Sequence, residues 1–295
     1  MRISGLKTKI FLDSGDPIET QDVLNKMGFL DGQTTNPTLI SKNPDASKRL
    51  ESGDKFSKEG IFNFYKETVS KISKIIPQGS VSVEVYADQN TTYDEMLEMG
   101  RSMYLWIPNA HIKFPTTKAG LAAANTAVST GMRVNMTLVF SQVQAAAVYC
   151  ATVGANIGES LAGFKNVFVS PFVGRLDDRG ENGMDLVKNI IQMYSGGDGH
   201  VEVLTASVRN LSHFKYAIKL GSNIITAPYK VLMEWVDDKM SMPDSKFKYD
   251  FRGFAPIAYE FISLEEPFGV YNIDHDLTKK GIEKFSSDWN SLVKS

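Results

Sequence analysis

Short apolar segments alternate with amphipathic segments along almost the whole chain. The apolar segments are rich in β-branched and aromatic residues, and most have too few polar positions for a strand with one face in water. Such segments are typical of strands buried on both faces, as in a parallel sheet. Eight of them occur, at Lys9–Leu12, Phe29–Thr34, Val81–Ala87, His111–Phe114, Arg133–Val139, Val167–Phe172, Val201–Thr205 and Asn223–Thr226.

Between the apolar segments, apolar residues recur every three to four positions, which indicates helices. The first such window, Pro17–Met27, starts with proline and is followed by Gly28, a start signal and a stop signal for a helix. The alternation predicts an α/β protein with a closed parallel (β/α)8 barrel, a TIM barrel, and an open doubly wound sheet is the alternative. The other helical windows are Phe62–Ile75, Tyr93–Tyr104, Thr117–Ser129, Ser141–Val153, Met184–Tyr194, Asn210–Leu220 and Tyr229–Val236.

Two segments interrupt this alternation. Ser41–Lys58 is polar and predicts a loop with a short helix after the second strand, and Ser241–Tyr271 is irregular, with Pro and aromatic residues. The chain then continues as a helix that Thr278 can cap. We expect residues 1–295 to form a single barrel domain, with residues 237–295 as a C-terminal extension that packs on the barrel. One face of the final helix carries Ile282, Phe285, Trp289 and Leu292.

Composition argues against several classes of protein. Lys and Arg number 32 and Asp and Glu 34, so the chain lacks the positive charge that binds nucleic acid or an anionic membrane. No window of about 18 residues is continuously apolar, and the first residues lack the apolar stretch of a signal peptide. The one cysteine, Cys150, cannot form an internal disulfide, and the four histidines lack metal-ligand spacing. We expect a cytoplasmic protein with no metal site.

Candidate site residues recur where the predicted strands end, the end that carries the active site in a (β/α)8 barrel. Glu84 and Lys113 lie within the third and fourth apolar segments, and Asp13 follows the first. An ionised Lys or Glu inside a barrel is costly unless it is paired, so these side chains predict a site. His111 shares a face with Lys113, because the two are two positions apart. The other candidates are Thr34, Asn36, Asn135, Thr137, Ser170, Phe172, Arg175, Ser207 and Arg209.

The sequence around these residues resembles the transaldolases. The resemblance spans residues 8 to about 236, and the combination of TTNP with SPFVGR is more specific than any single motif. The matching segments are FLDSGD at Asp13, DGQTTNPTLI from Asp31, VSVEVYAD at Glu84, HIKFPTT at Lys113, GMRVNMTLVFSQVQA at Asn135, VSPFVGRLDD at Ser170 and TASVRN, which ends in Asn210.

The resemblance implies a (β/α)8 barrel that forms a Schiff base on a lysine and needs neither cofactor nor metal. It implies transfer of a dihydroxyacetone unit from sedoheptulose 7-phosphate or fructose 6-phosphate to glyceraldehyde 3-phosphate or erythrose 4-phosphate, in the non-oxidative pentose phosphate pathway. Phosphorylated sugars are therefore the expected partners. The family includes dimers and larger rings, so the resemblance also allows a homo-oligomer.

By the same resemblance, Lys113 forms the Schiff base and Asp13 takes the proton of the C4 hydroxyl. Glu84 moves protons through a water that Thr137 helps to hold. Aromatic residues of Ser241–Tyr271 are expected to cover the barrel mouth and to shield the enamine intermediate. The residues that the resemblance assigns to substrate binding are Thr34, Asn36, Asn135, Ser170 and Phe172, with Arg175, Ser207 and Arg209 for the phosphate.

Two alternatives stay open. The fructose 6-phosphate aldolases look similar across the same motifs and release free dihydroxyacetone, but they typically carry Gln at the position of Glu84 and Tyr at that of Phe172. A Tyr hydroxyl there helps to protonate the enamine, which Phe172 cannot do, so both positions favour transfer. The second alternative is a non-catalytic barrel that binds sugar phosphates, which would keep the two arginines but has no need of Lys113.

Overall fold

The computed structural model describes residues 2–155, 161–251 and 253–294. Its strands are β1 (Lys9–Asp13), β2 (Gly32–Thr34), β3 (Ser80–Glu84), β4 (Ala110–Pro115), β5 (Val134–Val139), β6 (Val167–Pro171), β7 (Val201–Thr205) and β8 (Ile224–Ala227). They form one closed barrel in chain order, and every neighbouring pair is parallel. Because β1 pairs with both β2 and β8, the ring is complete. The predicted (β/α)8 barrel is confirmed, and the open sheet is wrong.

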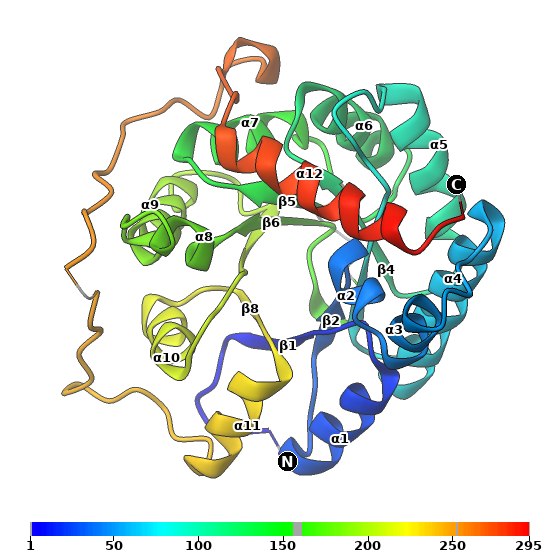
Figure 1. The fold of residues 1–295 in the computed structure, drawn as a ribbon. Coiled ribbons are helices and arrows are strands. Elements are labelled where there is room, and N and C mark those ends of the chain that lie inside the picture. Colours follow the sequence, from blue (N-terminus) through cyan, green and yellow to red (C-terminus); the bar gives the residue numbers. More distant parts are fainter. Residues whose placement is uncertain (1, 156–160, 252, 295) are drawn as a thin grey trace.

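A ring of helices surrounds the barrel (Figure 1). After each strand, one helix matches a predicted window to within a few residues at either end. These helices are α1 (Pro17–Met27), α4 (Lys58–Ile75), α5 (Tyr93–Tyr104), α6 (Lys118–Ser129), α7 (Gln142–Ala151), α9 (Gly183–Tyr194), α10 (Leu211–Leu220) and α11 (Tyr229–Asp237). Shorter elements are α8 (Val173–Asp177) and the 3-10 turns η1 (Leu161–Gly163) and η2 (Phe268–Val270).

The polar segment after β2 holds the expected short helix, α3 (Pro44–Glu51), but a second helix, α2 (Pro37–Ser41), precedes it. In each, proline occupies the first helical position and an asparagine caps the N-terminus, Asn36 for α2 and Asn43 for α3. With only five residues, α2 is too short to show an apolar period, so the sequence pattern does not predict it.

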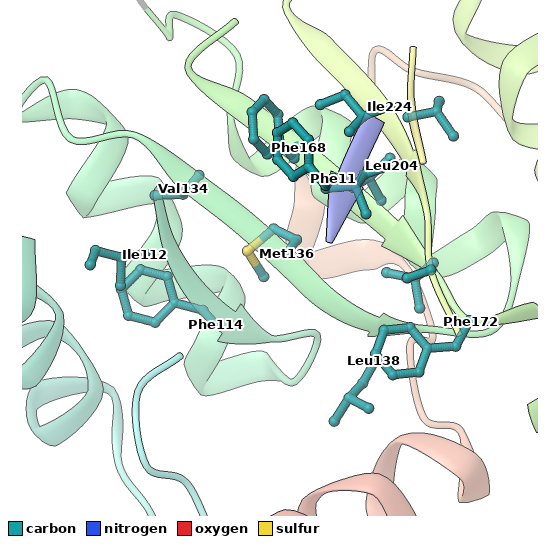
Figure 2. Close-up of a cluster of buried hydrophobic side chains, with 14 of the residues drawn as sticks. Phe11, Ile112, Phe114, Val134, Met136, Leu138, Phe168, Phe172, Leu204 and Ile224 are labelled. Atoms are coloured by element: carbon teal, nitrogen blue, oxygen red, sulfur yellow. The ribbon is translucent and has the colours of Figure 1, made fainter. Parts of the chain in front are cut away.

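The lower half of the barrel interior, toward the amino ends of the strands, is filled mainly with apolar and aromatic side chains. Phe11 and Phe168 meet edge to face at 6.2 Å, with Leu204 and Ile224 near them (Figure 2). His111 stacks on Phe168 at 4.0 Å. It therefore faces the interior like Lys113, as predicted, but one layer deeper. Polar side chains in this half are few and paired: His111 bonds Ser80, and Lys9 forms an ion pair with Glu202.

The helix α12 (Asp276–Ser291) crosses the carboxyl end of the barrel, near β5 and β6 in Figure 1. Its N-cap is His275, whose Nδ1 accepts a hydrogen bond from the backbone N of Leu277. The expectation that Thr278 caps this helix is wrong, because its hydroxyl docks the helix instead: it donates to Leu138 O at 2.9 Å. The predicted apolar face is confirmed as buried, with Ile282, Phe285, Trp289 and Leu292.

The segment between α11 and α12 runs around the outside of the barrel (Figure 1, orange). Gln142 of α7 bonds both the backbone N and the backbone O of Glu260, and Asn189 of α9 donates to Ile257 O. These side chains hold the segment against the helices, and none of its described residues lines the cavity at the barrel mouth. The expectation that its aromatic residues cover the mouth is therefore wrong, and α12 lies there instead.

Candidate active site

A cavity of about 390 Å³ opens at the carboxyl end of the barrel. Nine of the twelve predicted site residues line it: Asp13, Thr34, Asn36, Lys113, Ser170, Phe172, Arg175, Ser207 and Arg209. The other three, Glu84, Asn135 and Thr137, are buried beside or beneath these residues. The barrel topology brings them together because parallel strands end on one side.

Lys113 and Glu84 form a buried ion pair beneath the cavity. They are paired residues of the neighbouring strands β4 and β3, and Lys113 Nζ lies 2.8 Å from Glu84 Oε2. Only 4% and 3% of the two side chains is exposed, and Nζ also donates to Thr35 O at 3.0 Å. Burial raises the pKa of the Glu84 carboxyl above its usual range, against the opposing effect of Lys113. A carboxyl with a raised pKa is a better proton acceptor, and Glu84 lies within reach of Lys113 Nζ.

Asp13 lies at the end of β1, on the same cavity as Lys113. Its Oδ1 accepts a hydrogen bond from Thr34 Oγ1 at 2.7 Å. Thr34 Oγ1 also lies 2.6 Å from Thr226 Oγ1. Because Thr34 donates its proton to Asp13, it accepts the hydrogen bond from Thr226. Burial raises the pKa of Asp13, while Lys113 opposes the rise. A carboxyl with a raised pKa serves well as a proton acceptor and donor near neutral pH.

Polar groups of β5 and β6 form the next part of the site. Ser170 Oγ donates to Asn135 Oδ1 at 2.6 Å, and Asn135 Nδ2 donates to Ser82 Oγ at 3.1 Å. Thr137 is fully buried, and its Oγ1 has no hydrogen-bond partner among the described residues. Buried hydroxyls are nearly always hydrogen-bonded, so Thr137 is suited to hold a water or a substrate group.

Asn36 lies at the rim, where it joins β2 to α2. Its Oδ1 accepts from the backbone N of Leu39 at 2.8 Å as the N-cap of α2. This bond fixes the carboxamide beside the cavity and leaves Nδ2 as its remaining donor group.

Arg175 is held between two aromatic rings. Its guanidinium lies 5.5 Å from the ring centre of Phe172 and 5.3 Å from that of Phe285, which comes from α12. Within the part of the chain that the structure describes, no carboxylate lies within salt-bridge distance of it. Burial lowers the pKa of Arg175, which Glu84 opposes. A partly desolvated guanidinium of this kind binds a phosphate strongly.

Arg209 is more exposed than Arg175 and donates to Asp178 Oδ2 at 2.8 Å, in an exposed ion pair. Its side chain packs on Gly174, where an added Cβ would lie 2.2 Å from Arg209 Nε. Ser207 adopts the left-handed backbone conformation with φ 57°, and both residues line the cavity. An exposed ion pair is weak, so Arg209 remains available to an anion.

Several residues of the site were not predicted from the sequence. Lys284 and Phe285 reach the cavity from α12, and Lys42 and Thr38 reach it from α2. The helix α12 lies outside the eight strand–helix units, and α2 is too short to show an apolar period, so the sequence pattern gave no signal for these residues. Tyr65 also contacts the site from α4, through a hydroxyl that a helical apolar period does not reveal. Within the described residues, no group of three or more His, Cys, Asp or Glu is placed to hold a metal ion.

The chain is similar to known proteins along nearly its whole length. Residues 10–295 match the family described as Transaldolase/Fructose-6-phosphate aldolase. A protein of Dehalococcoides mccartyi named "Probable transaldolase" is 34% identical over 97% of this chain and 100% of its own length. One of Mesorhizobium japonicum with the same name is 38% identical over 79% of this chain and 91% of its own. No helix of the described residues is long and apolar enough to cross a membrane.

Proposed function

The chain belongs to the transaldolase/fructose-6-phosphate aldolase family, and from this premise we propose that it is a transaldolase. It transfers a dihydroxyacetone unit, through a Schiff base on Lys113, from a ketose phosphate to an aldose phosphate. The donors are sedoheptulose 7-phosphate or fructose 6-phosphate, and the acceptors are glyceraldehyde 3-phosphate or erythrose 4-phosphate, as in the non-oxidative pentose phosphate pathway.

The observation that carries this proposal is the buried pair of Lys113 and Glu84 at the floor of the cavity. A lysine attacks a carbonyl only as the neutral amine, and Glu84 lies 2.8 Å away to accept its proton. The pair is flanked by a third ionisable group, Asp13, on the same cavity. A barrel that only binds sugar phosphates has no need of this arrangement.

In the first half-reaction, Lys113 Nζ attacks C2 of the ketose and forms a carbinolamine. Glu84 supplies a proton to the departing hydroxyl through a water held at Thr137 Oγ1, the buried hydroxyl without a protein partner. Water leaves and the iminium forms. Its positive nitrogen then serves as the electron sink for the next step.

Asp13 next takes the proton of the C4 hydroxyl. The C3–C4 bond breaks, its electrons pass into the iminium, and an aldose phosphate leaves while a three-carbon enamine stays on Lys113. The acceptor aldose enters, the enamine attacks its aldehyde carbon, and Asp13 returns the proton. Water then hydrolyses the new iminium, which releases the product ketose phosphate and Lys113.

The remaining residues hold the two ends of the substrate. Asn36, Asn135 and Ser170 bind the hydroxyls of the three-carbon unit, and Asn135 is the strand neighbour of Lys113. Arg175 and Arg209, with Ser207, bind the phosphate, and all three line the cavity. Two charged groups from successive strand ends suit the dianion better than one.

Release of free dihydroxyacetone is the second candidate function, because the family includes aldolases. The enamine must then be protonated by a group near it. Phe172 lines the cavity and carries no hydroxyl, and its ring instead packs on Phe140 and Arg175. This favours transfer over release.

The test is a coupled assay with fructose 6-phosphate, with and without erythrose 4-phosphate, on the wild type and Lys113→Ala. We expect glyceraldehyde 3-phosphate only when the acceptor is present, and a rate that falls to background in the variant. Product without the acceptor would identify an aldolase and would overturn the assignment from Phe172. If neither protein forms product and borohydride treatment traps no adduct, the proposed Schiff base on Lys113 is contradicted.

A further inference from the structure

The hydrogen-bond ladder between β2 and β3 stops at the catalytic pair. Thr34 and Ser82 are paired, and Thr35 N donates to Ser82 O at 3.0 Å. In a continuing parallel ladder, the next hydrogen bond would run from Glu84 N to Thr35 O. The structure has two other bonds in its place. Glu84 N donates to the hydroxyl of Tyr65 at 2.9 Å, and Thr35 O accepts from Lys113 Nζ at 3.0 Å.

The direction of the bonds around Tyr65 is fixed by the groups present. Thr35 Oγ1 donates its one proton to Ser82 O at 2.7 Å, since a carbonyl oxygen can only accept. At the 2.6 Å contact between the two hydroxyls, Tyr65 must therefore donate to Thr35. Tyr65 thus accepts from the chain of Glu84 and donates to the residue whose carbonyl binds Lys113.

Tyr65 is suited to this role because it is rigid and protonated. It is fully buried, and its ring meets the edges of Trp106 and Trp289, each at 5.8 Å. Burial raises the pKa of its hydroxyl well above the usual value, so the group stays a donor across the range in which enzymes work.

Resting on the proposed function, we propose that Tyr65 is a positioning residue for Schiff-base formation. By taking the N–H of Glu84, it frees the carbonyl of Thr35 for Lys113, and it fixes the backbone that carries Glu84. Without the hydroxyl, the ladder bond from Glu84 N to Thr35 O can form. Lys113 then shares its acceptor with the ladder bond, and the distance between amine and carboxylate is no longer held.

The experiment compares Tyr65→Phe with Tyr194→Phe. Tyr194 is also buried and donates one hydrogen bond to a backbone carbonyl, that of Ala145 at 2.7 Å, away from the cavity. Two quantities are measured at saturating fructose 6-phosphate: kcat of transfer, and the rate at which borohydride traps the ketose on Lys113. The KM of the aldose acceptor and the melting temperature are measured beside them.

For Tyr65→Phe, we expect kcat and the trapping rate to fall together by about 10- to 100-fold, the loss typical of a small misplacement of reacting groups. The KM of the acceptor should stay within about twofold, because the phosphate residues are untouched. Tyr194→Phe should keep the wild-type rates. Equal rates in the two variants, or a rise in KM alone, would overturn the role of Tyr65.

Two further results keep the outcomes distinct. If the wild type itself traps no ketose, the proposed function fails, whatever Tyr65 does. If Tyr65→Phe does not fold, Thr35→Val replaces it, since it keeps the carbonyl but removes the group that accepts the proton of Tyr65. We expect Thr35→Val to slow trapping as well, and a wild-type trapping rate in this variant would refute the proposal.

Discussion

Asp13, the proposed general base, lies in an environment that is unfavourable for its charge. Burial raises its pKa in the folded protein, although Lys113 opposes the rise. Folding therefore favours the protonated carboxyl. At neutral pH, where the unfolded chain carries the ionised form, this difference costs stability. The cost is present above the raised pKa and disappears as the pH falls below the usual value of an aspartate.

Asp13→Asn should separate the two halves of the reaction. The amide cannot take the proton of the C4 hydroxyl, so transfer should fall by roughly 10²- to 10⁴-fold, the usual contribution of a general base. Schiff-base formation depends on Lys113 and Glu84, so borohydride should still trap fructose 6-phosphate. An assay of transfer beside mass spectrometry of the trapped protein tests this. A variant that neither transfers nor traps would assign Asp13 to an earlier step.

The same variant should be more stable than the wild type at pH 7 to 8, because the amide carries no charge to desolvate. The gain in the free energy of unfolding should shrink as the pH is lowered toward 4, where Asp13 is protonated in the wild type as well. Urea unfolding at several pH values measures it. A gain that grows on acidification would contradict the direction of the pKa shift.

Single site residues could be predicted from the sequence where they lie at or near the end of a strand. Asp13 and Glu84 are the last residues of their strands and Lys113 lies two positions before the end of its strand, so the barrel topology placed them together. Tyr65 could not be predicted in this way. Its role depends on a hydroxyl that replaces one ladder bond, and this needs the three-dimensional positions of two strands and a helix.

The helix α12 determines how Arg175 is presented. Phe285 contributes one of its two aromatic neighbours, and Gly281 allows the close approach. A Cβ at Gly281 would lie 2.6 Å from Arg175 Nη1 and 2.6 Å from the side chain of Leu138. The proposed phosphate site is therefore shared between the barrel and a helix outside the eightfold pattern.

Gly281→Ala should displace the guanidinium and weaken phosphate binding. We expect the KM of erythrose 4-phosphate to rise by about 10- to 100-fold, which corresponds to the loss of one charged hydrogen bond. The rate with unphosphorylated erythrose should change little. Gly269→Ala is the matched control, since nothing lies within 4 Å of its added Cβ. A similar loss with both acceptors would mean that α12 acts on the reacting groups instead.

Elements were predicted well where an apolar period of sufficient length exists. The windows Pro17–Met27 and Tyr93–Tyr104 coincide with α1 and α5. The short α2 was not predicted, since a five-residue helix shows no apolar period. The N-terminus of α12 was predicted wrongly, because Thr278 makes a tertiary contact and does not cap the helix. The same lack of a period left the path of residues 241–275 undetermined, and abundance of aromatic residues was a misleading guide to it.

The whole molecule is organised as an apolar lower half and a polar upper half of one barrel, and His111 lies in the lower half. Its Nε2 donates to Lys165 O and its Nδ1 accepts from Ser80 Oγ, so the neutral ring satisfies both partners. Burial lowers the pKa of His111 to about 3. Because the unfolded chain protonates this histidine near pH 6.5, stability is lost as the pH falls from 6.5 toward 3.

His111→Asn should make the stability of the protein less dependent on pH in this range. The variant is expected to be less stable at pH 7, since it loses the stacking on Phe168. Between pH 6.5 and 4, however, its free energy of unfolding should fall less steeply than that of the wild type. Urea unfolding at matched pH values gives both slopes. Parallel slopes would show that His111 does not contribute to acid sensitivity.

The position of α12 has a consequence for the order in which the protein becomes active during synthesis. The barrel can close once β8 has been made, because β8 pairs with β1. At that moment Phe285 and Gly281 have not yet been added to the growing chain. A nascent barrel therefore holds Lys113 and Arg175 before α12 supplies the second aromatic ring beside Arg175, so on the proposed function the phosphate site would be the last part of the active site to be completed.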